Sequence, residues 1–352
     1  MTRFIQLHLL VSYPPANLNR DDLGRPKTAL MGGVERLRVS SQSLKRAWRT
    51  SEIFQQALAG CIGVRTKRLG IEVYKQLIAA GVKEKDAQEW ASEVASTYGK
   101  VKKDKPLEIE QLVHIAPEER KSLEKLVATL SAERRAPTDD DLEELLHDQQ
   151  AVDIAMFGRM LASKPKRNKE AAVQVAHALG VHASVIEDDY FTAVDDLNAR
   201  DEDAGAGHVD EAGFASAVFY EYLCIDRDQL KHNLNGDEEL TRKALKALIE
   251  AALTVGPSGK QNSFASRAYA HYALAEKGTR QPRSLSLAFV KPVTGGDYAQ
   301  EAIKALEAVR NNMNKVYGPC AHADYGINVL DGSGSVAELI EFAAAEAGFF
   351  EE

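Results

Sequence analysis

The chain has 352 residues, of which 44% are hydrophobic and 27% charged, and its 44 Lys and Arg against 52 Asp and Glu give a net charge of −8. This composition supports a sizeable core and excludes global disorder, and no apolar run approaches the ~20 residues of a membrane span. The three cysteines form no C-x-x-C pair and no export signal precedes the first apolar segment, so we expect a cytoplasmic protein without a disulfide framework or a cysteine zinc site.

Positive charge is concentrated at the start of the chain. Residues 1–50 contain nine Lys or Arg and three acidic residues, a net charge of +6, so the other 302 residues carry −14. Bulk acidity argues against a protein that coats nucleic acid over its whole surface. It leaves room for a local basic groove, because phosphate binding depends on the charges in contact.

The first elements in chain order are a strand, a loop and a helix. Apolar residues of one parity over 4–12 predict a strand with one buried face, and a turn-rich loop follows up to the Gly32-Gly33 break. Residues 37–39 read as a short extended piece. Four polar residues from Ser40 to Ser43 then predict the start of a helix over 41–58, since serine side chains cap free amides.

The middle of the chain changes pattern. Helical spacing of Leu, Ile and Val indicates a block of helices over 60–150, with a lysine-rich loop at 99–105. After it we expect a strand at 152–157, a basic loop at 163–169 and an Ala-rich helix at 171–179.

The last third contains an acidic segment and further regular elements. Residues 188–210 carry eight acids and two glycines, which suggests an exposed hairpin or arm. Periodicity predicts the remaining elements: strands at 217–225 and 285–290, and helices at 238–253, 299–314 and 336–347.

Taken in order, these elements give a β-α-β-β-α-β pattern. This is the split βαβ arrangement of ferredoxin-like folds and RNA-recognition motifs, so we predict an α+β fold with a large helical insertion and an extended arm or hairpin. Such a sheet often serves as a platform for nucleic acid. The fold alone does not establish that function.

The segment from Asn19 to Arg49 carries the strongest functional signal. A helix start with several hydroxyl groups, with Lys45 and Arg49 one and two turns later, can bind phosphate groups without reading bases. The alternative is a capped amphipathic helix whose charges are simply solvated, and periodicity alone does not decide between the two.

Several motifs in this order resemble the CasC family, the repeated backbone subunit of the type I-E CRISPR Cascade complex. They are Leu-Asn-Arg-Asp-Asp at 18–22, Gly32-Gly33, Arg-Val-Ser-Ser-Gln-Ser-Leu-Lys-Arg-Ala at 38–47, Val-Asp-Ile-Ala at 152–155 with Gly-Arg-Met at 158–160, Phe-Thr-Ala-Val-Asp-Asp at 191–196 and Gly-Lys-Gln at 259–261. The resemblance runs from residue 1 to about 290 and is loose over the helical block and the last 60 residues.

The resemblance implies a hand-shaped protein that oligomerises along guide RNA (crRNA) and presents it for pairing with a target DNA strand in antiviral defence. Its partners would be crRNA, target DNA, other copies of itself and other Cascade subunits, in a prokaryotic cytoplasm and without a membrane or cofactor. The implied parts are a palm at 1–59, 151–187 and 216–352, the last range including the C-terminal helices, helical fingers at 60–150 and a thumb at 188–215.

The resemblance and the charge pattern together give a set of expected RNA-binding residues. Met160 would be an apolar wedge against a base step, and Phe191 would stack on a displaced base at the root of the thumb. The chain departs from the family at Val34-Glu35, where relatives tend to be basic, and in a shorter basic loop after Met160. The full expected set is Asn19, Arg20, Lys27, Ser40, Ser41, Gln42, Ser43, Lys45, Arg46, Arg49, Arg159, Met160, Lys164, Lys166, Arg167, Phe191, Thr192, Lys260 and Gln261.

Each of these residues also has a structural interpretation. Met160 could fill a core and Phe191 could pack within the arm, as such residues usually do. A metal-dependent endoribonuclease using Asp21 or Asp196 is the alternative function, because paired carboxylates can hold Mg²⁺. The scattered histidines and the absence of nucleotide-binding or nucleophile motifs favour binding over catalysis, and we predict no catalytic residue and no metal site.

Overall fold

A computed structural model describes residues 2–146, 150–161, 164–193 and 208–346 of the chain. The chain divides into two compact units. The first unit comprises Met1–Phe54, Val175–Ile225 and Leu245–Glu352, and the second comprises Gln55–Gln174 and Asp226–Ala244. Within the described ranges, no helix is long and apolar enough to cross a membrane.

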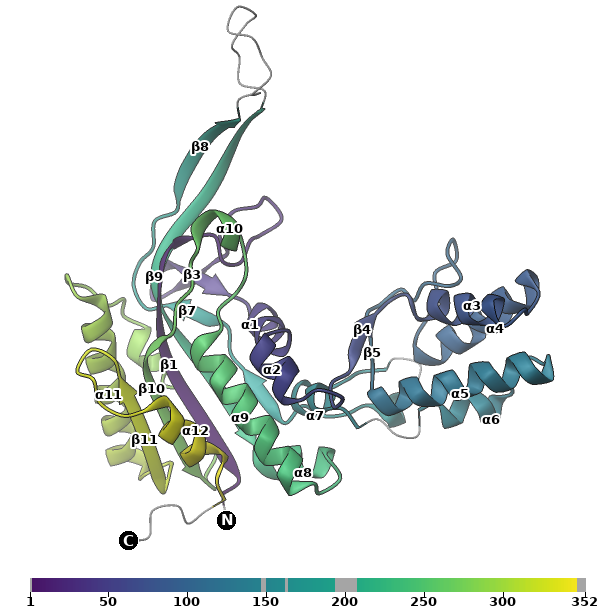
Figure 1. The fold of residues 1–352 in the computed structure, drawn as a ribbon. Helices are drawn as coiled ribbons and strands as arrows, with labels where there is room; N and C mark the ends of the chain where they lie inside the picture. Colours follow the sequence, from purple (N-terminus) through teal and green to yellow (C-terminus); the bar gives the residue numbers. More distant parts are fainter. Residues whose placement is uncertain (1, 147–149, 162–163, 194–207, 347–352) are drawn as a thin grey trace, which may run out of the picture. The chain divides into compact units, whose positions relative to one another are not determined.

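A large sheet forms the centre of the first unit (Figure 1). Its strands lie in the order β11-β10-β1-β9-β7-β3-β2, and the β1–β10, β10–β11, β7–β9, β3–β7 and β2–β3 pairs are antiparallel. The strands are β1 (Phe4–Ala16), β2 (Thr28–Met31), β3 (Val34–Val39), β7 (Ala178–Gly180), β9 (His208–Asp226), β10 (Ala270–Gly278) and β11 (Ala323–Asn328).

Strand β1 is buried on both faces rather than on one. Residues 5–11 are all buried, including Gln6 and His8, which we expected on an exposed face. The face of Leu10 is covered by a cluster that includes Ile303 and Leu306 of α11 (Tyr298–Tyr317). Polar residues on this face are accommodated by partners: His8 Nδ1 lies 2.8 Å from the Tyr220 hydroxyl.

The first unit also contains several helices, and three further elements have residues in both units. The first unit contains α1 (Ser41–Arg49), α10 (Gln261–Phe264), α11, α12 (Val336–Ala344) and the 3₁₀ helix η2 (Ser286–Phe289). The three elements with residues in both units are α2 (Glu52–Ala57), β6 (Val173–Val175) and α9 (Glu238–Thr254). The expected helices at 41–58, 238–253, 299–314 and 336–347 are thus confirmed, the first as two helices.

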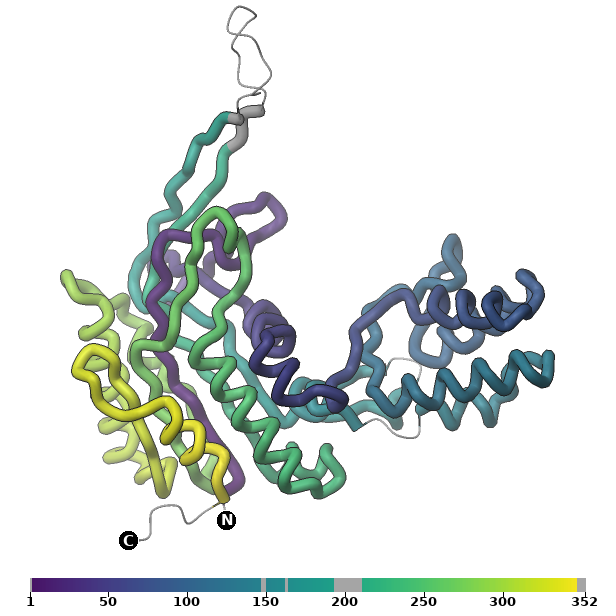
Figure 2. The backbone as a smooth tube through the Cα atoms, viewed as in Figure 1, coloured from purple at the N-terminus to yellow at the C-terminus, as the bar shows by residue number. Residues whose placement is uncertain are grey.

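The acidic arm begins as a two-stranded ribbon. β8 (Glu187–Ala193) pairs antiparallel with the first part of β9, from Glu187 opposite Phe214 to Ala193 opposite His208. Figure 2 shows these two strands running side by side. The hairpin is therefore confirmed at its base, while residues 194–207 lie outside the described ranges.

The second unit is mainly helical, as we expected for 60–150. Its core joins Leu69, Trp90 and Leu130 from three helices with Val113 of a small two-stranded sheet. Its elements are β4 (Val64–Thr66), α3 (Leu69–Ala79), α4 (Glu84–Tyr98), β5 (Val113–Ile115), α5 (Pro117–Glu133), α6 (Asp139–Glu144), α7 (Val152–Phe157), η1 (Pro165–Arg167) and α8 (Arg227–Asn233). The described part of the chain holds twelve α-helices and a large antiparallel sheet, which confirms the α+β class.

Three predicted elements are wrong. Residues 152–157 form helix α7 rather than a strand, and a six-residue apolar run cannot distinguish the two by periodicity. Residues 171–179 form β6 and β7 rather than a helix, because their backbone pairs with β9. Residues 285–290 form no strand but contain the 3₁₀ helix η2, and Leu285 N, just before that helix, donates a hydrogen bond to the Tyr220 hydroxyl at 3.0 Å.

Candidate nucleic-acid interface

Helix α1 begins at the serine-rich segment, as the sequence predicts. Ser40 is the N-cap, and its side chain accepts a hydrogen bond from Ser43 N at 3.2 Å. Ser40 N donates to Asn19 Oδ1 at 2.9 Å, and Ser41 N donates to His177 Nδ1 at 3.2 Å. The backbone amides of Ser40, Ser41 and Ser43 are therefore already satisfied within the protein and are not open to a phosphate.

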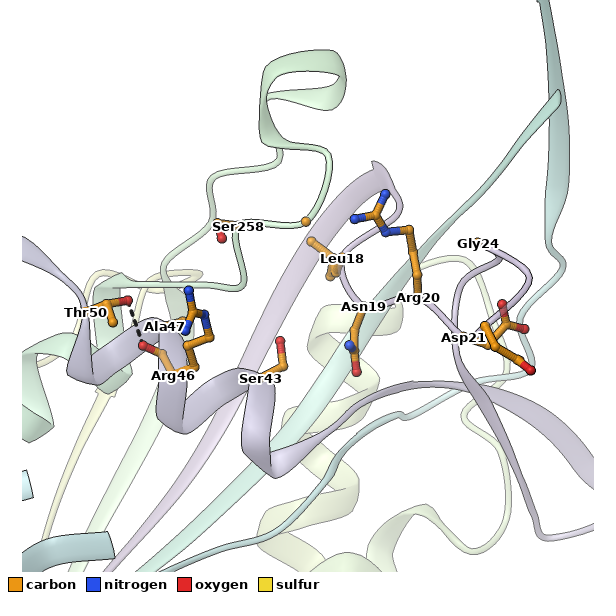
Figure 3. Close-up of a pocket in the computed structure, with 12 residues that line it drawn as sticks. Leu18, Asn19, Arg20, Asp21, Gly24, Ser43, Arg46, Ala47, Thr50 and Ser258 are labelled. Atoms are coloured by element: carbon orange, nitrogen blue, oxygen red, sulfur yellow. Dashed lines mark hydrogen bonds between the residues drawn. The ribbon is translucent and has the colours of Figure 1, made fainter. Parts of the chain in front are cut away.

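A hollow of about 590 Å³ lies beside α1 in the first unit; we call it the first hollow. Figure 3 shows the Arg20 and Arg46 side chains entering it from two different elements, the loop after β1 and helix α1. From α1, Ser43 and Arg46 of the expected set line this hollow, whereas Gln42, Lys45 and Arg49 of the same set do not. Its lining is Leu18, Asn19, Arg20, Asp21, Asp22, Gly24, Ser43, Arg46, Ala47, Thr50, Ser258 and Gly259.

Close backbone packing builds the walls of the first hollow. A Cβ on Gly259 would lie 2.2 Å from the Leu18 carbonyl oxygen, so only glycine allows this approach. The loop that follows Leu18 is held by Asp21, whose Oδ1 accepts hydrogen bonds from Leu23 N and Arg25 N, both at 2.9 Å. The Gly-Lys-Gln segment and the Asn-Arg-Asp-Asp segment, far apart in sequence, thus meet at one site.

Two arginine side chains and two aspartates line the first hollow. Arg20 and Arg46 are exposed, and neither guanidinium makes an ion pair with another residue in the described ranges. Asp21 and Asp22 also line the hollow, but one Asp21 oxygen is already occupied by two backbone amides. Arginine pairs of this kind bind phosphate oxygens with a planar fork of donors.

A second group of cations surrounds His177 near the start of α1. Arg38 Nη1 lies 3.2 Å from His177 Nδ1. Desolvation, followed by the positive charges of Arg38, Lys27 and Lys45, lowers the pKa of His177. Because Lys27 and Lys45 both act on His177, these two predicted residues belong to one positively charged region. The sequence analysis did not select His177, because residues 171–179 were predicted to form a helix and no motif includes this histidine.

Two arginines of the basic segment are buried. Arg36 is fully buried, and its guanidinium donates to Gly180 O at 3.0 Å and to Phe289 O at 3.1 Å. Arg49 is only 9% exposed. Arg49 therefore lies at the margin of the surface that we expected it to share with Lys45, whereas Gln42 of the same stripe is exposed.

Two further predicted regions of the first unit lie around the hairpin and the 259–261 loop. Phe191 is 38% exposed on β8 beside the exposed Thr192. Arg25 Nη2 donates to Asp188 Oδ1 at 2.8 Å, which ties the loop before β2 to the base of the hairpin. Lys260, with a left-handed φ of 50°, precedes Gln261 at the start of α10, directly after the wall of the first hollow.

The predicted residues of the second unit differ in environment. Arg159 is buried in an ion pair with Glu119, with Nη1–Oε2 at 2.7 Å and Nη2–Oε1 at 3.0 Å, so its environment is that of a structural residue. Met160 is 75% exposed and is not core filler. Lys164 lies 3.3 Å from Glu143, while Lys166 and Arg167 line a separate polar hollow of about 500 Å³.

The residues of the alternative metal-dependent chemistry do not gather into a centre. Within the ranges that the structure describes, no group of three or more His, Cys, Asp or Glu side chains could hold a metal ion. Asp21 shapes its own loop, and Asp196 lies outside the described residues.

Comparison with known proteins identifies the family. The model of the CT1975-like protein family (Cas_CT1975) matches residues 5–344. The chain belongs to this family of Cas proteins. A search of curated proteins finds no match.

Solved structures extend this result. The chain is similar to one described as "CRISPR RNA-guided surveillance complex, pre-nicking", with 30% identity and a TM-score of 0.84, over 97% of this chain and 99% of that chain. A second, described as "CRISPR RNA-guided surveillance complex", is 26% identical with a TM-score of 0.62 over 97% and 98% of the two chains. The resemblance that the sequence motifs suggested is consistent with this family of CRISPR proteins.

Proposed function

We propose that this chain is the backbone subunit of a Cascade-type CRISPR surveillance complex, which binds guide RNA and oligomerises along it. The observation that carries the proposal is the match to a solved surveillance-complex chain over 97% of this chain at 30% identity. The first hollow supports it, because two arginines without ionic partners among the described residues face a single site.

The topology of the first unit supports a palm of ferredoxin-like type. Helix α1 follows β1 in the chain and precedes β7, and α9 lies between β9 and β10. If β1, β7, β9 and β10 are numbered 1 to 4 in chain order, their spatial order β10-β1-β9-β7 is the 4-1-3-2 order of a split βαβ fold. In this fold β7 and β10 take the places of the strands that we expected at 152–157 and 285–290. We assign 60–150 to the fingers, the 188–215 hairpin to the thumb and the remainder to the palm.

The geometry favours binding that is independent of base sequence. Arg20 and Arg46 can pair with phosphate oxygens in the first hollow, and the Lys27, Arg38 and Lys45 group continues the positive surface toward His177. Contacts of this kind hold the backbone of any guide and leave base edges free to pair with target DNA, as in another RNA-guided effector.

Met160 and Phe191 supply the apolar contacts of the proposal. Both are exposed, Met160 by 75% and Phe191 by 38%, so either side chain can meet a base without rearrangement of a core. Lys164, Lys166 and Arg167 add positive charge from the second unit. We assign no RNA contact to Arg159, whose guanidinium is committed to Glu119.

The chain in this proposal binds RNA without cutting it, in the cytoplasm of a prokaryote and with other Cascade subunits as partners. Asp21, the described carboxylate of the alternative nuclease, uses one oxygen to hold its own loop. Incubation of the RNA-bound chain with Mg²⁺ tests the point. We expect RNA of unchanged length, and shortening that disappears in Asp21→Ala would favour the nuclease.

A double charge reversal tests the main proposal. We expect the chain co-expressed with a guide to purify with RNA of discrete length, and Arg20→Glu with Arg46→Glu to lose that RNA. Lys291→Glu with Lys315→Glu is the matched control, since both lysines are exposed in the first unit outside the first hollow and the charge change is the same. Ultraviolet spectra and a denaturing gel measure the RNA. RNA retained equally by both double variants contradicts the proposed site.

A further inference from the structure

A second hollow of about 980 Å³ adjoins the first in the same unit. Both hollows are lined by Ala47, Thr50 and Ser258, so together they form one trough that follows the α1 face and the 254–261 loop. None of the sequence motifs pointed to the far end of this trough. That end is lined by Ser266, Arg267, Ala268 and Tyr269, just before β10 begins at Ala270.

A tight turn fixes the outward direction of the residues at this end. Ala265 has a left-handed φ of 47°, and Arg267 N donates to Ala265 O at 2.8 Å. Ser266 is 1% exposed, with its hydroxyl 3.2 Å from Gln261 Oε1. Because Ser266 is anchored inward, the residues after it are presented to the trough.

The two presented side chains form a pair suited to a nucleotide. Tyr269 is 71% exposed, although a tyrosine ring gains most when it is covered. Arg267 is exposed, and its guanidinium makes no ion pair with any residue that the structure describes. An aromatic ring that can stack on any base, next to a free guanidinium that can bind phosphate, is the combination used for single-stranded nucleic acid.

The size and remaining lining of the second hollow agree with this chemistry. Its volume is at the upper end of the range for small-molecule sites, which leaves room for a base with its sugar and phosphate. Thr50 and Ser51 add hydroxyl groups, and Glu52 is the one acid in the lining. The acid disfavours a phosphate beside it and so directs the phosphate toward Arg267.

We propose that the second hollow is a nucleotide subsite of the guide-binding trough, in which Tyr269 stacks on a base and Arg267 binds the adjacent phosphate. The inference rests on the proposed function, because it places in the trough the same RNA strand that Arg20 and Arg46 hold. It adds a stacking platform at the palm, separate from Met160 and from the hairpin.

Binding of single-stranded RNA of mixed sequence to the full chain tests this assignment. Tyr269→Ala should weaken binding about tenfold, the usual loss for one stacked base, and Tyr269→Phe should stay within about twofold of the unmodified chain. Arg267→Gln should also weaken binding, and it should reduce the slope of log affinity against log salt by about 0.7, the value for one phosphate contact. Tyr269→Ala should leave that slope unchanged.

The controls separate failure of this inference from failure of the proposed function. Tyr317 is 77% exposed at the end of α11 and lines neither hollow, so Tyr317→Ala should bind RNA like the unmodified chain. If the unmodified chain binds RNA and Tyr269→Ala binds equally well, the subsite is refuted and the function stands. If the unmodified chain does not bind RNA, both fail.

Covalent trapping gives a second readout that does not depend on stability. RNA containing 4-thiouridine, irradiated in complex with the unmodified chain, should crosslink to the peptide that contains Tyr269. A crosslink confined to other peptides overturns the assignment. So does a Tyr269→Ala variant that loses self-association while its RNA affinity is unchanged, since the second hollow would then hold a neighbouring protein chain.

Discussion

Glu221 is a carboxyl group buried in the middle of the sheet without a described partner. It lies on β9, is 3% exposed, and makes no hydrogen bond or ion pair with another residue in the described ranges. Burial raises the pKa of Glu221 to about 8 from the usual value of 4.5. Burial, and then the charge of Glu221, raises the pKa of the neighbouring Tyr13. The Tyr13 ring lies against Gly256, which lines the second hollow.

The pKa shift fixes both the sign and the size of a pH effect on stability. Between pH 4.5 and about 8 the folded chain keeps a proton on Glu221 that the unfolded chain has lost. The free energy of unfolding therefore falls as pH rises through this window, and levels off above about pH 8. The full fall is about 5 kcal/mol, of which about 3 kcal/mol belongs to the interval between pH 6 and pH 9.

Glu221→Gln removes the titration while keeping the size of the side chain. Urea unfolding at pH 6 and pH 9 measures the free energy of unfolding of both proteins. We expect the variant to gain about 3 kcal/mol relative to the unmodified chain between these pH values. Glu250→Gln, at an exposed position on α9, is the matched control and should follow the unmodified chain. Parallel pH profiles for Glu221→Gln and the unmodified chain would refute the reasoning.

Three further substitutions test other parts of the structure. In Gly259→Ala the new Cβ would lie 2.2 Å from the Leu18 carbonyl oxygen, so the loop must move. The free energy of unfolding should fall by about 1–3 kcal/mol and RNA binding should weaken. Gly296→Ala, which has open space around it, should change neither. Arg159→Gln leaves Glu119 buried without its charge partner and should cost about 3–5 kcal/mol in urea unfolding, so a loss under about 1 kcal/mol would contradict the buried pair. Met160→Ala should change stability by less than about 0.5 kcal/mol because the side chain is 75% exposed, yet weaken RNA binding in a filter assay, and unchanged binding would exclude the wedge role.

Local signals were enough to predict the elements whose cause is local. Ser40 caps α1 through a hydrogen bond from Ser43 N, as the serine-rich start indicated. Helices α9 and α11 follow from helical spacing, and the hairpin from the acidic residues and the two glycines of 188–210. In each case the residues that determine the element lie within it.

Elements that depend on distant partners were missed or misread. β10 is an Ala-rich strand with Glu276 and Lys277 buried in it, a composition that no strand pattern favours. Arg310 Nε lies 2.8 Å from Glu276, and Lys277 Nζ donates to Phe342 O at 2.8 Å. These charges are tolerated because partners more than 30 residues away neutralise or bind them, and such partners are not visible in a local window.

The candidate site was predictable as a region but not residue by residue. The motif segments at 18–22 and 259–261 meet in one wall of the first hollow, through the contact of Gly259 with Leu18. The facing stripe of α1, however, carries Arg46 rather than Lys45 and Arg49. The choice between the two stripes depends on how α1 is rotated against the sheet, which the buried Trp48 and Leu44 determine.

Arg36 and Arg38 have the same side chain but different roles, since one is buried in the fold and the other lies at the candidate site. They lie two positions apart on β3, yet Arg36 is fully buried with its guanidinium hydrogen-bonded to carbonyl groups, and Arg38 reaches the exposed His177. Their shared parity would place both on one face of an ideal strand. The difference arises along the strand, because Arg36 lies beneath η2 whereas Arg38 pairs with Leu179 close to the start of α1. A basic run in sequence therefore overstates the charge available to RNA, and the cations that remain exposed around the trough are the ones whose removal should change the salt dependence of binding.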